Sequence, residues 1–578
     1  MKTQIQTPRV HLPHPRKASY SSLSCLTALV VLALLGGQSI ATAQYDNYDD
    51  GDDITPVLWT HVDPVFVASG GLSTPNTYDA TAFKYQLVAD ASSGGLGLGP
   101  ARTFSYPADN YTNFYVSVDL VDWSVATAQA IGLVARVSDV GPGTTDGYAF
   151  GIAAGGVIFS GANYIRILRL ENESTKDVFG SGPAGDSVMP IPDLDPLKDY
   201  RMVFMGNGTD LEGRLYELPN VTTPIAVVKG NTAGDAIIHT SGVSGMLGFG
   251  LATPLGVDMT FDNYYASSRC PMTITDMVVV DNFNDGNDVS APGGLTWDHY
   301  DPIRQGVGGG PPDQVVWTFP AGGYQIVAHD DYGGAVGTPR GASTEPATYT
   351  DFRIAADIVN WDDGNGQNGI GLMARLANIG VGATTGYIWT ADVSGSGDVD
   401  MSSLAGEVPS GLSLSGSDKL KMVPGNSYRF VFSGKGSQLR GSVFQLPETM
   451  NPLVDCVATD ATYVSGKAGL LAAGNSGGDA TFDNYSNTGL TAPAISVTFG
   501  AGPGGEFTVT WPANIECVWV LESTSDLSPP AVWTQVATTT TAGAAAKILY
   551  DPLTGKNTYT SATPVSTGGN TYYRLKQL

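Results

Sequence analysis

Apolar and polar residues alternate along much of this chain, and the alternation predicts β-strands. In residues 113–120 every second side chain is apolar, in the order Phe, Val, Val and Leu. A period of two places these side chains on one face of a strand and the polar ones on the other. Residues 351–358 repeat the pattern with Phe, Ile, Ala and Ile. No helical period of any length accompanies it, so the pattern indicates an all-β protein.

Short phrases occur twice in the chain, in the same order. Their copies occupy residues 46–53 and 281–288 (acidic), 59–64 and 297–302 (Trp-x-His-x-Asp-Pro), and 260–264 and 481–485 (Thr-Phe-Asp-Asn-Tyr). The first phrase opens each copy and the last one closes it. The chain is therefore a tandem repeat of a whole domain, and the two copies are called repeat 1 and repeat 2 below.

Further strands match between the repeats. Residues 131–136 (Ile-Gly-Leu-Val-Ala-Arg) resemble residues 370–375, and a hairpin with a glycine turn follows in both copies. Short strands joined by Gly, Pro and Asn turns predict a two-sheet antiparallel sandwich in each repeat. The expected organisation is a signal peptide at 1–43, repeat 1 at 44–268, a linker at 269–279, repeat 2 at 280–487 and a small β-sandwich at 488–578.

The first 43 residues have the pattern of an export signal. Basic residues precede an apolar core at residues 26–35, and Ala41-Thr42-Ala43 supplies the small residues that a signal peptidase requires. The apolar core is too short to favour a stable membrane span. We expect cleavage after Ala43, no membrane insertion, and a protein that is secreted or lies at the cell surface.

The charge balance argues against nucleic acid as a partner. The formal net charge is −26, from 55 acidic and 29 basic residues, so a polyanion would be repelled at long range. Outside the leader the cysteines are Cys270, Cys456 and Cys517, and their spacing matches no metal site. At most one disulfide can form among them, and the sequence leaves its pairing open.

The repeated phrases resemble those of the concanavalin A-like, or laminin G-like, jelly-roll superfamily, as found in large secreted bacterial proteins. The resemblance rests on the Asp-x-Phe-x-Asp-Gly opening, the Gly-Leu-x-Ala-Arg strand, the Tyr-Arg-x-x-Phe hairpin and the Phe-Asp-Asn-Tyr ending. It implies two tandem jelly-roll β-sandwiches. This fold serves lectins, carbohydrate-binding modules, glycan-cleaving enzymes and adhesion modules, so it does not fix the function. The remaining residues resemble a small fibronectin-like terminal domain.

Calcium is the cofactor that the acidic phrases suggest. Clustered carboxylates at a glycine turn are the oxygen ligands that Ca²⁺ prefers, and many jelly-roll modules hold a structural calcium between their terminal strands. The candidate ligands are Asp46, Asp50 and Asp262 in repeat 1, and Asp281, Asp285 and Asp483 in repeat 2. The alternative is a solvated acidic turn whose carboxylates bond backbone amides.

A sugar-binding face is the second hypothesis. Pyranose rings stack on Trp or Tyr, while Asp and Arg bond the hydroxyls. The candidate residues are Tyr115, Asp119, Trp123, Arg136 and Tyr148 in repeat 1, and Asp357, Trp361, Arg375 and Tyr387 in repeat 2. Arg353 takes the place of Tyr115 in repeat 2. The alternative is that the aromatic residues belong to the core and that Asp119 and Arg136 form a structural ion pair.

Catalysis is less well supported by the sequence. Glycan hydrolases of this fold carry a Glu-x-Asp-x-x-Glu pattern, which is missing here. Glu171 and Glu173 have the separation of one strand face but no clear equivalent in repeat 2. His329 has no matching histidine in repeat 1, and His61 and His299 match each other but are expected to bond the adjacent Asp-Pro turn.

The sequence therefore favours a secreted, non-catalytic carbohydrate-binding or adhesion protein whose partner is a polysaccharide or cell-surface glycan. Duplication suits this function, because two weak sites on one chain gain avidity. A polysaccharide-degrading enzyme, either hydrolase or lyase, and a structural cell-surface protein are the alternatives.

Overall fold

The structure is a computed structural model that describes residues 43–577 with internal gaps. The gaps are residues 63–75, 90–101, 126–128, 142, 155–162, 181–186, 251–255, 273–276, 289–294, 301–314, 321, 329–339, 362–366, 381, 394–396, 417–418, 475–477, 489–495, 500–506, 513–518, 525–533, 539–547, 552–555 and 561–571. The expected signal peptide before residue 43, His329 and Cys517 lie outside the described residues.

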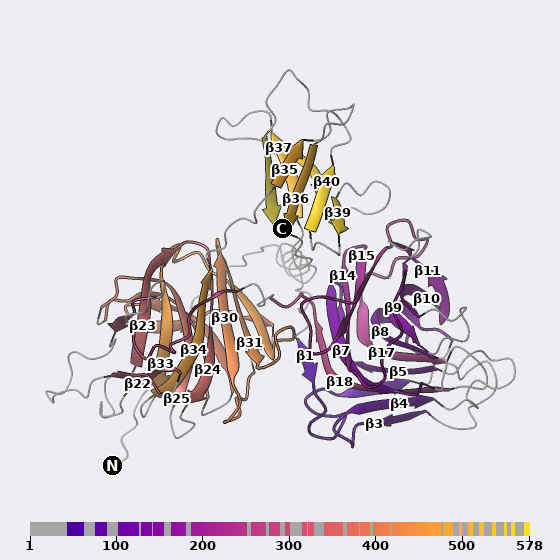
Figure 1. The fold of residues 1–578 in the computed structure, drawn as a ribbon, viewed down its shortest axis with the longest axis horizontal. Coiled ribbons are helices and arrows are strands. Elements are labelled where there is room, and N and C mark those ends of the chain that lie inside the picture. The colour runs from indigo at the N-terminus through magenta and orange to yellow at the C-terminus, as the bar shows by residue number, and fades with distance from the viewer. Residues whose placement is uncertain are drawn as a thin grey trace, which may run out of the picture. The chain divides into compact units, whose positions relative to one another are not determined.

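Repeat 1 consists of two antiparallel sheets, here called sheet A and sheet B (Figure 1). The strands of sheet A are β1 Gln44–Asp46, β3 Thr77–Asp79, β4 Tyr85–Ala89, β7 Phe114–Trp123, β12 Phe179–Gly180, β14 Tyr200–Asn207, β15 Asp210–Glu217, β16 Ala226–Asn231 and β18 Val257–Ser267. Their order is β12–β16–β15–β14–β7–β18–β4–β3, and β1 also pairs with β18.

The second sheet of repeat 1 is sheet B. Its strands are β2 Trp59–Val62, β5 Arg102–Pro107, β6 Asn110–Tyr111, β8 Gln129–Ser138, β9 Asp146–Ala154, β10 Tyr164–Glu171, β11 Ser174–Asp177, β13 Val188–Pro190 and β17 Gly242–Gly250. Their order is β11–β10–β9–β8–β17–β5–β2, with β13 paired to β10 and β6 to β17.

Repeat 2 has the same two sheets. In its sheet A the strands are β19 Val279–Asp281, β21 Val316–Thr318, β22 Tyr324–Ala328, β24 Phe352–Trp361, β29 Ser415–Gly416, β30 Tyr428–Lys435, β31 Gln438–Gln445, β32 Val454–Thr459 and β34 Gly478–Thr488. In its sheet B they are β20 Asp298–Tyr300, β23 Arg340–Tyr349, β25 Gln367–Ala377, β26 Thr385–Ala391, β27 Val399–Ala405, β28 Val408–Gly411 and β33 Gly466–Gly474. The sheet orders are β21–β22–β34–β24–β30–β31–β32–β29, with β19 on β34, and β20–β23–β33–β25–β26–β27–β28.

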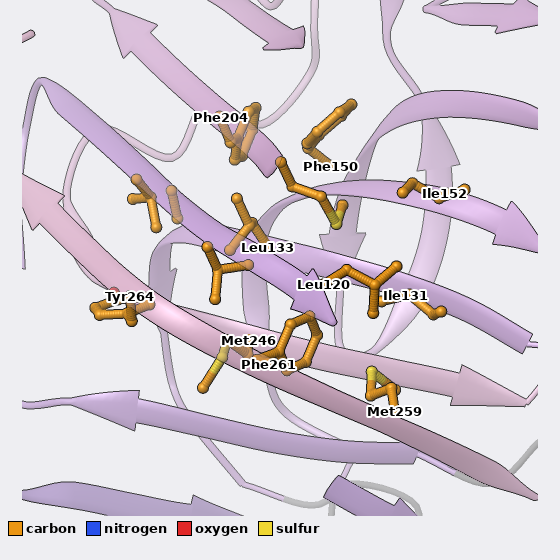
Figure 2. Close-up of a cluster of buried hydrophobic side chains, with 14 of the residues drawn as sticks. Leu120, Ile131, Leu133, Phe150, Ile152, Phe204, Met246, Met259, Phe261 and Tyr264 are labelled. Atoms are coloured by element: carbon orange, nitrogen blue, oxygen red, sulfur yellow. The ribbon is translucent and has the colours of Figure 1, made fainter. Parts of the chain in front are cut away.

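The core of each repeat lies between its two sheets. In repeat 1, Leu120 and Phe261 of sheet A are buried in one cluster with Leu133, Phe150 and Met246 of sheet B (Figure 2). Alternation along the strands supplies these side chains, as the sequence predicts. The chain is therefore all-β, with a two-sheet sandwich in each repeat.

Beyond repeat 2 the chain forms two smaller antiparallel sheets. Their strands are β35 Ser496–Phe499, β36 Phe507–Pro512, β37 Trp519–Thr524, β38 Thr534–Thr538, β39 Ile548–Asp551, β40 Lys556–Thr560 and β41 Tyr572–Gln577. The orders are β35–β36–β40–β39 and β38–β37–β41. Within the described residues, no helix has the length and hydropathy that a membrane span requires.

Candidate functional site

The first acidic residue of each repeat is a buried hydrogen-bond acceptor. Asp46 is fully buried, and its Oδ2 accepts the indole N–H of Trp59 at 2.8 Å while Oδ1 accepts the amide of Tyr48 at 2.9 Å. In repeat 2, Asp281 accepts the indole N–H of Trp297 at 2.9 Å and the amide of Phe283 at 2.9 Å. The repeated Asp and Trp thus form one structural pair that anchors the opening strand.

The other predicted calcium ligands bond nearby protein groups. Asp50 accepts the hydroxyl of Thr55 at 2.9 Å, and Asp285 accepts the amide of Asn287 at 3.2 Å. Asp262 and Asp483 each accept the amide of the next residue at 2.7 Å. Among the described residues no group of three or more His, Cys, Asp or Glu side chains lies close enough to hold a metal ion. Calcium binding at these turns stays a prediction.

The repeated histidines bond the acidic turns. Nε2 of His61 lies 3.0 Å from Oδ2 of Asp53, and Nε2 of His299 lies 2.7 Å from Oδ2 of Asp288. Burial lowers the pKa of His299, and the facing carboxylate opposes this shift. The Asp-Pro turns, to which the sequence assigned these histidines, lie outside the described residues, so that interpretation stays untested.

Asp119 forms a buried ion pair, but its partner is Arg201 rather than the expected Arg136. Nε and Nη2 of Arg201 donate to the two carboxylate oxygens of Asp119 at 2.6 and 2.9 Å. In repeat 2 Arg429 holds Asp357 at 2.6 and 2.8 Å. Sequence reasoning chose the wrong arginine because period-two patterns place a residue on a face without giving its neighbour in the adjacent strand.

The closing phrase completes this ion pair. Asn263 and Asn484 have left-handed backbones, with φ of 52° and 49°, and asparagine tolerates that region better than most residues. Their side-chain amides donate to Asp119 and Asp357 at 3.0 and 2.9 Å. The asparagine of Phe-Asp-Asn-Tyr is therefore retained in both repeats for structure.

Arg136 and Arg375 are buried at equivalent positions of sheet B. The Nε of Arg136 donates to the carbonyl of Thr112 at 2.7 Å, and the Nε of Arg375 donates to the carbonyl of Thr350 at 2.9 Å. Only 1% of each arginine is exposed. Both side chains therefore fasten loops to the sandwich and are not displayed on a surface.

The remaining predicted ligand residues are also buried. Exposed fractions are Tyr115 4%, Asp119 3%, Trp123 7%, Tyr148 0%, Asp357 2%, Trp361 7% and Tyr387 0%. The hydroxyls of Tyr115 and Ser117, on the outer face of sheet A, donate to Oδ1 of Asn451 at 3.4 and 3.0 Å. Ligand binding by these residues stays a prediction, and no common surface brings the set together.

A pocket on the outer face of sheet B in repeat 1 is lined by none of the predicted ligand residues. Its walls are apolar and one end carries a threonine and a glutamate: Phe104, Val134, Val137, Leu170, Leu247, Phe249, Thr145 and Glu173. Thr145 is 5% exposed and Glu173 is 8% exposed. Glu173 therefore places a carboxyl group beside Thr145 in an otherwise apolar lining, and this makes it a candidate functional group.

Glu173 in repeat 1 and Glu407 in repeat 2 have the same strained backbone conformation. Asn172 and Glu173 have φ of 49° and 61° in the turn between β10 and β11, and Gly406 and Glu407 have φ of 60° and 67° between β27 and β28. Two positive φ angles suit a tight hairpin, but glutamate adopts them at a cost. The amide of each glutamate donates to a matching threonine carbonyl, Thr145 or Thr384, at 2.9 Å.

Sequence comparison missed this match. Glu173 was expected to lack an equivalent in repeat 2, and the structure shows that Glu407 is its equivalent. The neighbouring Glu171 lies 2.6 Å from Nη2 of Arg169 and forms an ion pair with it. The signal that could have found the match is a turn residue of left-handed preference, Asn or Gly, directly before a glutamate in each repeat.

Burial raises the pKa of three carboxyl groups in repeat 1, those of Asp46, Asp210 and Asp262, to about 6. The folded state therefore keeps protons that the unfolded chain loses near pH 3.8. Stability from these groups is fully present below about pH 4 and is lost as pH rises through 6. Asp262→Asn should reduce the change in unfolding free energy between pH 4.5 and pH 6.5 by about 1 kcal/mol. Because solvent screens this partly exposed carboxyl group, the expected change is smaller than the full free energy that its pKa shift implies.

Urea unfolding of the wild type and Asp262→Asn at pH 4.5 and 6.5 measures this effect. An equal change in unfolding free energy between the two pH values in both proteins would show that Asp262 does not titrate as its burial requires.

No family model matches the chain, and no curated protein matches it. Solved structures do match parts of it. The carbohydrate binding module CBM66 from Bacillus subtilis has 19% identity and a TM-score of 0.23, covering 30% of this chain and 91% of that chain. Lectin I-B4 from Griffonia simplicifolia, in its metal-free form, has 10% identity and a TM-score of 0.27, covering 39% and 99%. The Ca²⁺/Man3GlcNAc-bound exoplasmic/lumenal domain of VIP36 has 8% identity and a TM-score of 0.26, covering 41% and 92%.

Proposed function

We propose that this chain is a secreted, non-catalytic glycan-binding protein and that a sugar residue lies over the sheet B pocket of repeat 1 with one hydroxyl in it, because the pocket volume of about 20 Å³ admits a hydroxyl group but not a ring. The observation that carries the proposal is the Glu173–Thr145 end of an apolar pocket. A sugar ring has apolar C–H faces and a rim of hydroxyls, so it matches apolar walls that end in a hydrogen-bond acceptor.

The lining of the pocket favours binding over hydrolysis. Glycoside hydrolases place two carboxyl groups about 5–10 Å apart across the scissile bond. Of the described residues that line the pocket, Glu173 alone has a carboxyl group. One carboxylate can accept hydroxyl protons in hydrogen bonds, but it does not supply both an acid and a base.

The negative charge of the chain disfavours acidic glycans as ligands. A net charge of −26 and a carboxylate in the pocket both disfavour uronate or sulfated chains. The proposed ligand is therefore a neutral polysaccharide. The acidic turns carry the accompanying proposal of a calcium requirement, which rests on their composition and on the family resemblance.

Glu173→Gln is expected to weaken binding to the retained polysaccharide about 10- to 100-fold, since a hydrogen bond to a charged acceptor contributes about 1.5–3 kcal/mol. The measurement is retention of the chain without its first 43 residues on amylose, cellulose, xylan and β-1,3-glucan. Glu171→Gln is the matched control, because Glu171 lies two residues away and bonds Arg169.

Each arm of this experiment has a separate meaning. Absence of retention of the wild type on all four polysaccharides would sink the proposed function. Retention that Glu173→Gln and Glu171→Gln leave equally unchanged would place the binding site elsewhere. The same columns run with calcium and with a chelator test the calcium requirement on its own.

A further inference from the structure

We propose that His239 makes one loop of repeat 1 sensitive to pH. The loop consists of residues 232–241, between β16 and β17, and is called the His239 loop below. While the imidazole is neutral it holds the loop closed against sheet B, and protonation in mild acid releases the loop. This inference goes beyond the proposed function and does not depend on glycan binding.

Polar contacts hold the His239 loop at two points. At the first, Oδ2 of Asp235 lies 2.8 Å from Nη1 of Arg169 on β10. At the second, the amide of His239 donates to the hydroxyl of Tyr148 on β9 at 3.1 Å. The carbonyl of the same histidine accepts Nη1 of Arg136 on β8 at 3.4 Å. The second point therefore joins the loop to two central strands of sheet B.

His239 is the buried side chain of the loop. In residues 233–241, all of which the structure describes, every other residue is exposed except the partly buried Asp235. His239 itself is 9% exposed, and its ring packs edge to face on Tyr148 with centroids 5.2 Å apart. By contrast, Ile237 and Ile238 are 47% and 40% exposed. The attachment of the loop therefore depends on one buried ring.

This buried imidazole has one nitrogen without a partner. Its ring bonds the backbone of Leu170, and Nε2 of His239 has no hydrogen-bond partner among the described residues. A neutral imidazole carries one N–H and one acceptor nitrogen, so a single bond to a carbonyl satisfies its donor. A protonated imidazole carries two N–H donors, and the second would be buried without an acceptor. Protonation is therefore unfavourable while the loop is closed.

The charged groups that face His239 do not remove this penalty. Asp146 at the start of β9 and Glu171 at the end of β10 favour the protonated imidazole, while Arg169 of β10 opposes it. Asp146 already accepts a backbone amide at 2.7 Å, and Glu171 lies 2.6 Å from Nη2 of Arg169. On β8, Arg136 adds a second positive charge at the carbonyl of the histidine. Burial is the largest influence, and it lowers the pKa of His239 below its ordinary value of 6.5.

Acid therefore weakens the closed loop. The unfolded loop takes up a proton near pH 6.5, whereas the closed loop resists it. The stabilisation of the closed loop is fully present above about pH 6.5 and is lost as the pH falls below that value. Histidine is the side chain whose ordinary pKa lies in this range, so mild acid is sufficient to release the loop.

Repeat 2 has a tyrosine at the equivalent position. The amide of Tyr463 donates to the hydroxyl of Tyr387 at 3.0 Å, and its carbonyl accepts Nη1 of Arg375 at 3.0 Å. The two tyrosine rings lie edge to face with centroids 5.3 Å apart. The hydroxyl of Tyr463 donates to the carbonyl of Leu404, which matches Leu170 in strand register. A phenol has no basic nitrogen, so the same contacts are made in repeat 2 without a group that acid protonates.

Hydrogen–deuterium exchange of the chain without residues 1–43, measured by mass spectrometry at pH 7.5 and pH 5, tests the proposal. The variant is His239→Tyr, which gives repeat 1 the residue of repeat 2. Since intrinsic exchange varies with pH, the readout is the exchange rate of residues 233–241 in the wild type divided by the rate in His239→Tyr at the same pH. We expect this ratio to rise about 5-fold or more between pH 7.5 and pH 5, the smallest effect of a buried donor without an acceptor.

Two further variants separate the imidazole from other effects. Ile238→Ser changes the neighbouring exposed side chain and keeps the imidazole, so its loop should exchange as the wild type does at both pH values. Tyr463→His places an imidazole in repeat 2, and residues 460–466 should then gain the acid-dependent exchange that they lack in the wild type. Circular dichroism confirms that each variant is folded, and Tyr463→His tests the proposal alone if His239→Tyr does not fold.

Two outcomes would overturn the inference. One is a ratio that is the same at pH 7.5 and pH 5, since the closed loop would then be indifferent to protonation. The other is a ratio that rises equally in β14 and β15, because acid would then loosen the whole of repeat 1 rather than this loop. A rise confined to residues 233–241 supports the proposal, and its transfer to repeat 2 in Tyr463→His assigns it to the imidazole.

Discussion

Arg201→Ala is expected to lower the free energy of unfolding by about 3–5 kcal/mol, the usual cost of removing one partner from a buried ion pair. The side chains of Arg201 and Asp119 are each 4% exposed, so the remaining carboxylate would be left without its charge partner. Nη1 of Arg201 also lies 2.7 Å from Oε2 of Glu448, which would lose its charge partner and keep its hydrogen bonds from backbone amides. Urea unfolding followed by tryptophan fluorescence measures the loss.

Two variants control this prediction. Arg429→Ala removes the equivalent arginine of repeat 2, but Arg429 is 20% exposed, so water replaces part of the lost interaction and the cost should be smaller. Asp119→Leu/Arg201→Leu removes both charges and should recover much of the loss. A loss of less than 1 kcal/mol in Arg201→Ala would mean that Asp119 is solvated or protonated in the folded protein.

Asp46→Ala is expected to destabilise repeat 1 by about 2–4 kcal/mol. The substitution leaves two buried donors without an acceptor, the indole N–H of Trp59 and the amide of Tyr48, at about 1–3 kcal/mol each. Asp281→Ala should have a comparable effect on repeat 2. Calorimetric unfolding of both variants measures these losses.

A chelator distinguishes this structural function of Asp46 from calcium ligation. If Asp46 only accepts hydrogen bonds, any stability that a chelator removes from the wild type should be removed equally from Asp46→Ala. A chelator effect that disappears in Asp46→Ala would instead identify Asp46 as a metal ligand, as the sequence predicts.

Strand periodicity predicted the fold better than it predicted exposure. The alternation of residues 113–120 correctly placed Phe114 and Leu120 in the core, but the first seven residues of β7 are all buried. Periodicity assigns residues to two faces and carries no information on what covers the second face. In β7 that face holds Asp119 against Arg201 and Ser117 against Asn451, so residues expected at a surface are enclosed.

The pocket was missed for a related reason. Its lining comes from six strands or turns that are distant in sequence, and its key glutamates follow turns whose neighbours differ, Asn172 in repeat 1 and Gly406 in repeat 2. The register of the strands shows that Glu173 and Glu407 are equivalent, whereas the Asn or Gly before each glutamate is a weak signal in the sequence. The sequence shows that the histidine, the aspartate and the tryptophan recur in both repeats. It does not show which groups they bond, because hydrogen-bond geometry decides their partners.

The first and last strands of each repeat pair with each other, and this pairing constrains the order in which the protein can fold. Gln44 of β1 pairs with Ala266 of β18, and Val279 of β19 pairs with Ser486 of β34. The opening strand of each repeat pairs with a strand that is synthesised more than two hundred residues later, so we expect folding of each repeat to be slow. Because the opening phrases of the two repeats are alike, exchange of β1 and β19 between the closing strands is the misfolding route that this arrangement leaves open.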